Sequence, residues 1–195
     1  MDFTYQTTHK LFRTAFKLGF GWEVTGEDNL PQNGPVIVVA NHVSNFDPPI
    51  LAAALHRKVH YMAKEELFNN PIADKVLKYY GAFPVRRGGV GKSALRKGLQ
   101  ILKEEKILAL FPEGTRNQGP KLKKAKLGIV MLATKSQVPI LPVGLLGTRS
   151  PIQNQVKVNI GKPFRLTEYY NKKLDKTEMR QAGQEIMTQI EGLLE

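Results

Sequence analysis

The fold is decided by the stretch VIVVA at residues 36–40, which runs directly into NHVSNFDPP at residues 41–49. VIVVA is a continuous apolar, mostly β-branched run between the turn residues Gly34-Pro35 and Asn41. A short run of this kind predicts a buried strand. The polar residues after it would then lie at the carboxyl end of the strand, where open α/β sheets bind their ligands.

The rest of the chain alternates between strand and helix patterns. Similar strands are predicted at residues 59–63, 83–85, 107–111 and 140–145, and an outer strand at residues 156–160. Helices are predicted between them, at residues 48–55, 70–80, 92–105 and 122–136, and again from residue 177 onward. Alternating strands and helices build a mostly parallel central sheet flanked by helices, so the sequence predicts an α/β fold.

The N-terminal residues 1–21 form a separate predicted element, ahead of one globular domain at residues 22–195. Apolar and small residues recur there at helical spacing and three basic residues lie between them: Phe3, Leu11, Phe12, Ala15, Phe16, Gly19 and Phe20, with Lys10, Arg13 and Lys17. A basic, phenylalanine-rich amphipathic helix is typical of attachment to a membrane surface. A plain amphipathic helix packed on its own core fits this pattern as well.

Composition limits the function classes without choosing one. A chain of 195 residues fits one domain, and the absence of cysteine excludes disulfides and thiolate chemistry. The net charge of +12 favours anionic partners such as nucleic acid, lipid head groups, phosphorylated metabolites or an acidic carrier protein. No apolar run is long enough to span a membrane, and Asp2 argues against a signal peptide, so we expect the protein to stay on the side where it is made.

The first candidate site is the turn that holds His42 and Asp47. Pro48 suits the first turn of a helix, which makes Asp47 a candidate N-cap. The chain must turn sharply between His42 and Asp47, so their side chains are expected to meet. A carboxylate on one imidazole nitrogen fixes the tautomer and leaves the other nitrogen to act as a base. The simpler alternative is an N-capping aspartate beside an unrelated histidine.

The second candidate site is FPEGTR at residues 111–116, which again follows a predicted buried strand. Gly114 permits a sharp turn and close approach of the backbone to a ligand. Arg116 offers a planar fork that holds a phosphate through two hydrogen bonds. Because the carboxylate of Glu113 would repel a phosphate, it is expected to position the turn or an arginine. A turn with a solvated arginine is the alternative.

Two further segments carry weaker signals. GAFPVRRG at residues 81–88 brings Arg86 and Arg87 to the end of a strand, and only one of two adjacent side chains faces a given site. Lys64, at the end of the predicted strand 59–63, could join that arginine. VPILPV at residues 138–143 is a strand entered through proline and broken by it, and packing is its expected role.

Together, the four segments resemble the ordered motifs of the glycerolipid acyltransferase family, over roughly residues 22–160. Residues 41–47 are similar to the Asn-His-x-x-x-x-Asp motif, and residues 111–116 match the third motif in full. Residues 81–87 and 138–143 resemble the second and fourth motifs. The resemblance implies transfer of a fatty acyl group from a thioester to the free hydroxyl of 1-acylglycerol-3-phosphate, which makes phosphatidate.

The same resemblance implies a role for each matching residue. His42 would be the general base and Asp47 would orient it, while Arg87 and Arg116 would hold the substrate phosphate with help from Lys64. Glu113 and Gly114 would shape the turn that binds the phosphate. Thr115, which precedes Arg116, would also bind substrate. Arg86 stands where the family often has an acidic residue, so either Arg86 or Arg87 could face the phosphate, and the spacing from Gly81 favours Arg87.

The implied partners are lipids and their carriers. Lysophosphatidate would be the acceptor, and acyl carrier protein or coenzyme A would carry the acyl donor, with no bound cofactor, no metal and no nucleic acid. Residues 1–21 would press on the cytoplasmic face of the cell membrane as a peripheral or monotopic attachment. The basic cluster Lys121, Lys123, Lys124 and Lys126 could serve lipid, lysophosphatidate or an acidic carrier, or be a solvated face.

Other interpretations are weaker. Residues 88–93, GGVGKS, end like a phosphate-binding loop, but Arg86 stands where that motif needs glycine. His56 and His60 have zinc-like spacing without the glutamate of the zinc-protease pattern. A nucleic-acid binder would suit the charge but leaves the His42–Asp47 pair unexplained. A related enzyme that acylates glycerol-3-phosphate, a lysophospholipid or an aminolipid is the main alternative.

Overall fold

The computed structural model describes residues 3–85 and 91–195, with the side chains of residues 6–19 described within the first helix. Within these residues, seven strands form one sheet in the order β1-β7-β6-β2-β5-β3-β4. Their bounds are β1 Glu23–Thr25, β2 Val36–Ala40, β3 Val59–Lys64, β4 Ala82–Val85, β5 Ile107–Leu110, β6 Ile140–Leu146 and β7 Lys157–Ile160. Five neighbouring strand pairs are parallel and only β6–β7 is antiparallel. The predicted α/β fold with a mostly parallel sheet is confirmed.

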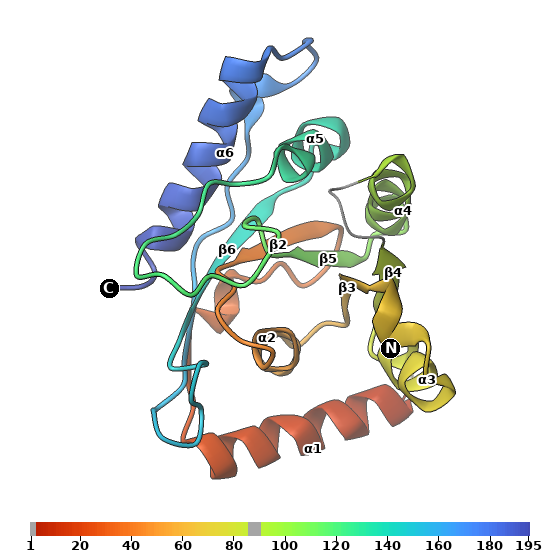
Figure 1. Cartoon of the computed structure of the whole chain (residues 1–195), viewed down its shortest axis with the longest axis vertical. Coiled ribbons are helices and arrows are strands. Elements are labelled where there is room, and N and C mark those ends of the chain that lie inside the picture. Colours follow the sequence, from red (N-terminus) through yellow and green to blue (C-terminus); the bar gives the residue numbers. More distant parts are fainter. Residues whose placement is uncertain (1–2, 86–90) are drawn as a thin grey trace.

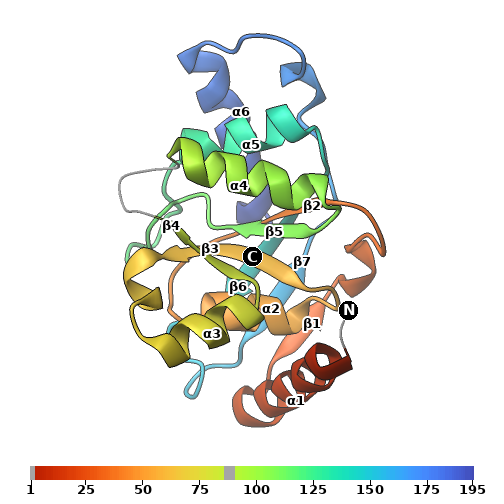
Figure 2. The ribbon, with the colours of Figure 1, turned by 90° about the vertical axis from the view of Figure 1, so that its right-hand side faces the viewer.

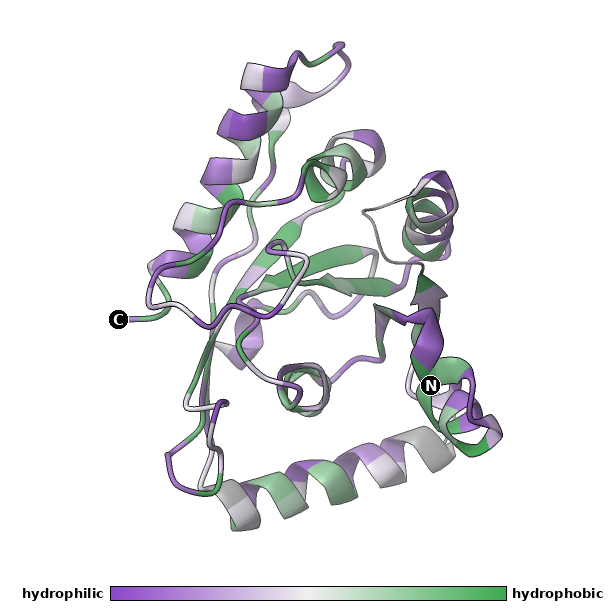
Figure 3. Cartoon of the chain, viewed as in Figure 1, coloured by the Kyte–Doolittle hydropathy of each residue, from purple (hydrophilic) through white to green (hydrophobic). Residues whose placement is uncertain are grey.

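Helices cover both faces of this sheet (Figures 1 and 2). Their bounds are α1 Phe3–Phe20, α2 Asp47–Ala54, α3 Pro71–Tyr79, α4 Lys92–Lys103, α5 Leu127–Ser136 and α6 Lys176–Glu191, with short 3₁₀ turns η1 Glu27–Asn29, η2 Glu65–Phe68 and η3 Thr167–Tyr169. Residues of α2 pack with the side chains of one sheet face, including Val36 and Val38. Residues of α4, α5 and α6 pack with those of the other face, including Ile37 and Val39. Figure 3 shows the apolar character of the central strands between these layers.

The strand β2 lies at the centre of the sheet because all five of its side chains are buried and apolar. It pairs with β5 on one side and with β6 on the other. The next strand, β3, pairs with the far side of β5. The carboxyl ends of three adjacent strands, β2, β5 and β3, therefore meet at one edge of the sheet. β2 and β5 are each followed by a predicted site segment, and β3 ends at the predicted site residue Lys64.

Three predictions about the secondary-structure elements differ from the structure. The helix predicted at residues 122–136 begins at Leu127, because backbone groups of residues 121–126 bond to side chains and carbonyls of the preceding turn. The strand at residues 156–160 was predicted to lie at the edge of the sheet, but the short β1 pairs with the outer side of β7 and is itself the edge strand. The strand β6 runs unbroken through Pro142, at a bulge where residues 161–163 lie opposite two residues of β6. A proline is tolerated there because the bulge leaves its nitrogen without a ladder partner.

The helix α1 lies across the carboxyl end of α2, at one end of the molecule (Figure 1). Its inward face packs on the protein: His9 Nε2 lies 2.9 Å from the carbonyl of Ala52, and Arg13 donates to the carbonyl of Ala54. Arg13 also pairs with Glu27, so its guanidinium is held against the protein, whereas Lys10 and Lys17 are exposed. A cationic side chain at the carboxyl end of a helix is stabilising because it opposes the helix dipole.

The apolar residues of α1 divide between its two faces. Phe12 stacks edge-on against Tyr80 and Phe16 packs on Trp22, so these two phenylalanines hold the helix on the protein. Leu11 and Leu18 point outward and are 69% and 82% exposed. Nowhere in residues 3–85 and 91–195 is there a helix long and apolar enough to cross a bilayer.

Candidate active site

His42 and Asp47 meet in the turn between β2 and α2, as the sequence predicted. His42 Nδ1 lies 2.7 Å from Asp47 Oδ2, and the Asp47 side chain is completely buried. A carboxylate oxygen only accepts hydrogen bonds, so Nδ1 carries the proton and the lone pair is left on Nε2. The His42 side chain remains 19% exposed and lines the large cavity described below. The pair therefore has the geometry of an oriented general base.

Asp47 is the first residue of α2 rather than its N-cap, which is Phe46. Its side chain turns back into the preceding loop, where Oδ2 accepts the backbone N–H groups of Val43 and Ser44, each at 2.7 Å. These bonds close the tight turn that the sequence predicted, and they hold the carboxylate where His42 needs it. The predicted capping role is wrong, and the predicted contact with His42 is right.

The backbone of His42 is held from both sides by the segment after β5. Its N–H donates to Glu113 Oε1 at 3.0 Å, and its carbonyl accepts the N–H of Asn117 at 2.6 Å. The His42 ring stacks on Phe111, with ring centroids 4.2 Å apart. Glu113 is 1% exposed, and its second oxygen accepts the N–H of Lys123. Glu113 thus positions the turn, one of the two roles expected for it, through the backbone of His42 and Lys123 and not through an arginine.

Asn117 and Arg149 are two residues that the sequence analysis missed. Asn117 is buried, and its side chain donates to the carbonyl of Lys121 and accepts the N–H of Gly119. Arg149, on the loop after β6, donates to the carbonyls of Asn117 and Gly119. The position of Asn117 directly after the FPEGTR motif was the one signal that could have indicated its role. Nothing in the sequence indicates that Arg149 approaches this loop.

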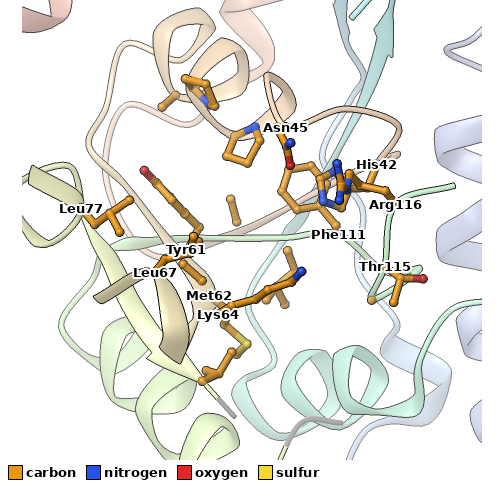
Figure 4. A pocket seen from close by; sticks show the side chains of 18 of the residues that line it. His42, Asn45, Tyr61, Met62, Lys64, Leu67, Leu77, Phe111, Thr115 and Arg116 are labelled. Atoms are coloured by element: carbon orange, nitrogen blue, oxygen red, sulfur yellow. The ribbon is translucent and has the colours of Figure 1, made fainter. Parts of the chain in front are cut away.

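The remaining predicted site residues come from two strand ends. Lys64 ends β3 and lines the cavity together with Gly114, Thr115 and Arg116. Figure 4 shows Lys64 extending across the cavity, with Arg116 beside His42. Neither the Lys64 ammonium nor the Arg116 guanidinium has a hydrogen-bond partner within the described parts of the chain. Arg86 and Arg87, and residues 88–90 of the glycine-rich stretch 88–93, lie outside the described residues.

Gly114 adopts a left-handed backbone conformation, with φ of 70°. A side chain at this position would also press on Lys126, whose Cγ lies 3.0 Å from the place a Cβ would occupy. Lys126 belongs to the basic cluster 121–126, which is a loop ahead of α5. The prediction that Gly114 makes a sharp turn is confirmed by its geometry.

A cavity of about 1460 Å³ opens at this edge of the sheet. Beside His42 and the cationic residues, its walls are mostly apolar and come from α1, α2, α3, α4, α5 and the ends of β3 and β5. Tyr61 stands in the wall, and burial raises the pKa of its phenol, which therefore stays neutral across the physiological range. The site combines one oriented base, the three cations Lys64, Arg116 and Lys126, and a large apolar space, as a ligand with a charged head and an apolar tail requires.

Comparisons with known proteins agree with this arrangement. A sequence model of the Acyltransferase family matches residues 21–146. The 1-acyl-sn-glycerol-3-phosphate acyltransferase of Bacillus subtilis is 30% identical over 171 residues, which cover 85% of this chain and 84% of the relative. The protein of the same name from Borreliella burgdorferi is 31% identical over 140 residues, 71% of this chain and 56% of the relative.

A solved structure shares the fold. The crystal structure of the 1-acyl-sn-glycerophosphate acyltransferase from Thermotoga maritima matches with a TM-score of 0.73 at 28% identity, covering 95% of this chain and 78% of that one. The fold and the site define an α/β protein with a histidine–aspartate pair at the carboxyl end of its central strand. The chain belongs to the Acyltransferase family.

Proposed function

We propose that the protein transfers a fatty acyl group from an acyl thioester to the sn-2 hydroxyl of 1-acylglycerol-3-phosphate, forming phosphatidate. The observation that carries this proposal is the His42–Asp47 pair at the wall of an apolar cavity that is also lined by the cations Lys64, Arg116 and Lys126. The printed names of the similar proteins from Bacillus subtilis and Borreliella burgdorferi support the choice of acceptor.

In the proposed reaction, Nε2 of His42 takes the proton from the acceptor hydroxyl as its oxygen attacks the thioester carbonyl. The new C–O bond forms, the C–S bond breaks, and the proton passes from His42 to the departing thiolate. Asp47 stabilises the imidazolium while it exists. Positioned proton transfer of this kind contributes about 10²–10⁴-fold in rate. No nucleophilic side chain is needed because the acceptor brings its own hydroxyl.

Arg116 and Lys64 are the proposed ligands of the acceptor phosphate. Arg116 is exposed at the end of the turn that Glu113 and Asn117 fix against His42. The backbone of Arg116 is therefore held at a set position relative to the base, and a phosphate bound by its guanidinium would present the neighbouring glycerol hydroxyl to His42. Arg87 is a further proposed phosphate ligand, on sequence grounds alone.

We also propose that α1 attaches the protein to the surface of the membrane. Leu11 and Leu18 are seven residues apart, so they share one helical face, and both point away from the protein. Lys10 and Lys17 are exposed beside that face, where lysine heads meet anionic lipid. Leu18→Lys should lower the fraction bound to phosphatidylglycerol-containing vesicles in a sedimentation assay. Met131→Lys on α5 is the matched control, and equal loss in both variants would contradict attachment through α1.

The transferase activity is tested with purified protein in liposomes, radiolabelled palmitoyl donor on coenzyme A or on acyl carrier protein, and 1-acylglycerol-3-phosphate. Phosphatidate should form with wild type and fall by at least about 10²-fold in His42→Ala. His56→Ala is the matched control, since that ring does not line the cavity. Transfer only to glycerol-3-phosphate, to a lysophospholipid or to an aminolipid would correct the acceptor, and full activity in His42→Ala would refute the mechanism.

A further inference from the structure

Gln118 is a cavity residue that the proposed reaction does not use. It follows Asn117 in the loop between β5 and α5, and it lines the cavity together with Thr115 and Arg116. Its side chain is exposed, and its carboxamide makes no hydrogen bond with any residue that the structure describes. A carboxamide offers two N–H donors and one acceptor oxygen. Gln118 therefore presents unused hydrogen-bond donors to a ligand in the cavity.

The backbone on both sides of Gln118 is held by hydrogen bonds. The N–H of Asn117 donates to the carbonyl of His42 at 2.6 Å, and the carbonyl of Asn117 accepts from Arg149 at 3.0 Å. The N–H of Gly119 donates to Oδ1 of Asn117 at 3.0 Å, and the carbonyl of Gly119 accepts from Arg149 at 3.2 Å. Both backbone polar groups of each flanking residue are therefore bonded.

Arg149 and Asn117, here called the loop clamp, act from outside and inside the loop. Arg149 lies 32 residues further along the chain, between β6 and β7, and its Nη2 donates to both flanking carbonyls. The side chain of Asn117 is 3% exposed and donates to the carbonyl of Lys121 at 2.6 Å. Because the clamp is bonded to the backbone of His42, it sets the position of Gln118 relative to the base.

The ligand chemistry that suits Gln118 is a phosphate monoester. Arg116, two residues earlier in the chain, is a proposed ligand of the acceptor phosphate, and both residues line the same cavity. An arginine fork engages two phosphate oxygens, and a phosphate monoester has three acceptor oxygens. An amide N–H next to this fork can therefore bond to the acceptor without competing with the arginine.

We infer that the carboxamide of Gln118 donates a hydrogen bond to the acceptor phosphate, and that the loop clamp holds it in place. Gln118 is then a binding residue, whereas Arg149 and Asn117 are positioning residues that act through it. This inference rests on the proposed function, because the phosphate is that of 1-acylglycerol-3-phosphate. It adds the β6–β7 loop, which lies outside the four sequence motifs, to the parts of the chain that build the site.

Gln118→Ala and the nearly isosteric Gln118→Glu test the contact with phosphate. The Kd of radiolabelled 1-acylglycerol-3-phosphate is measured in detergent without any acyl donor. Loss of a hydrogen bond to a charged group should raise the Kd about tenfold in Gln118→Ala. A carboxylate repels the phosphate, so Gln118→Glu should raise it by a further factor of about ten. Because 1-acylglycerol carries no phosphate, its Kd should be the same in all three proteins.

Arg149→Ala tests the loop clamp. It should raise the Kd of 1-acylglycerol-3-phosphate about tenfold in the wild-type background and have little further effect in Gln118→Ala, because the clamp acts through that side chain. Arg149→Lys keeps a cationic donor and should restore part of the affinity. Arg57→Ala is the matched control. Arg57 also donates to two loop carbonyls, those of Pro31 and Gly34, but it does not line the cavity, so the Kd should not change.

Three results would overturn the inference. The first is an equal Kd for Gln118→Ala and Gln118→Glu, and the second is full additivity of Gln118→Ala and Arg149→Ala. The third is a wild-type protein that binds 1-acylglycerol-3-phosphate no more tightly than 1-acylglycerol. Because these measurements need no acyl donor, they are independent of the transfer assay. Absence of transfer by wild type would refute the proposed function, whereas normal transfer with any of these three results would refute the role of Gln118 alone.

Discussion

The carboxylate of Glu113 accepts the backbone N–H of His42 at 3.0 Å, although the two residues lie 71 positions apart in the chain. This bond joins the turn after β5 to the turn after β2, across the pairing of two adjacent parallel strands. The other carboxylate oxygen accepts the N–H of Lys123, so one buried side chain fixes His42, the turn at residues 111–116 and the basic loop together. A charge-assisted bond of this kind is stronger than a neutral one.

Glu113→Gln should therefore lower both stability and turnover. Glutamine keeps one oxygen acceptor, but its amide nitrogen would face an N–H that also donates, which leaves a buried pair unsatisfied at a cost of about 1–3 kcal/mol. We expect a lower melting temperature by differential scanning fluorimetry and a reduced kcat. Glu104→Gln on the surface is the control. A variant with wild-type melting and kcat would show that Glu113 does not position the site.

Asp47→Asn tests the carboxylate that orients the base. The amide can still accept from Val43 and Ser44 through its oxygen, so the turn should persist. If the asparagine nitrogen faces His42, it is a donor opposite the donor Nδ1–H. If the asparagine oxygen faces His42, it is neutral and no longer stabilises an imidazolium. In either case kcat should fall by about 10²–10⁴-fold with little change in KM. Initial rates at saturating acceptor give the answer. A loss confined to KM would mean that Asp47 acts in binding rather than in proton transfer.

The strands and their order in the chain could be predicted because each is a short apolar run set off by turn residues. The order of strands within the sheet could not, because it depends on which edges pair after folding. The sequence placed His42, Lys64 and Arg116 at three strand ends without showing that β3, β5 and β2 are neighbours. Only the paired strands bring the three side chains to one cavity.

Contacts between residues remote in sequence also explain why residues 121–126 and the inward face of α1 were not predicted correctly. Residues 121–126 have helical composition, yet their backbone groups bond to Glu113, Pro112 and Asn117, and these partners are remote or outside any periodic pattern. On α1, helical spacing predicted the helix but not which of its faces meets α2. Arg13 faces inward because it donates to the carbonyl of Ala54 at the end of α2. Because that partner is remote in sequence, no local pattern indicates it.

Gly114→Ala should weaken acceptor binding. Its φ of 70° is strained for any residue with a Cβ, and the added carbon would displace Lys126. Left-handed backbone costs a non-glycine residue about 1–2 kcal/mol, so the turn that carries Arg116 should shift and KM for the acceptor should rise. Gly119→Ala in the same loop is the matched control, since a Cβ there meets its nearest atom at 3.5 Å. An equal rise in both variants would point to the loop as a whole.

His60 should make the fold acid-labile. Burial on β3 lowers the pKa of its imidazole, an effect to which Lys106 and Lys58 add, while the bond to the carbonyl of Ile107 opposes it. In the unfolded chain the imidazole titrates near its ordinary value of about 6.5. As pH falls below that value, the unfolded state binds the proton first, so the free energy of unfolding should decrease with decreasing pH. That loss should continue until pH reaches the folded pKa.

Urea unfolding at a series of pH values between neutral and acidic measures this slope. His60→Gln keeps a donor for the Ile107 carbonyl without a group that titrates, so its unfolding free energy should fall less steeply below about pH 6.5. If His60→Gln and wild type run parallel over the whole range, the imidazole of His60 is protonated equally readily in the folded and unfolded states, and burial on β3 does not control it.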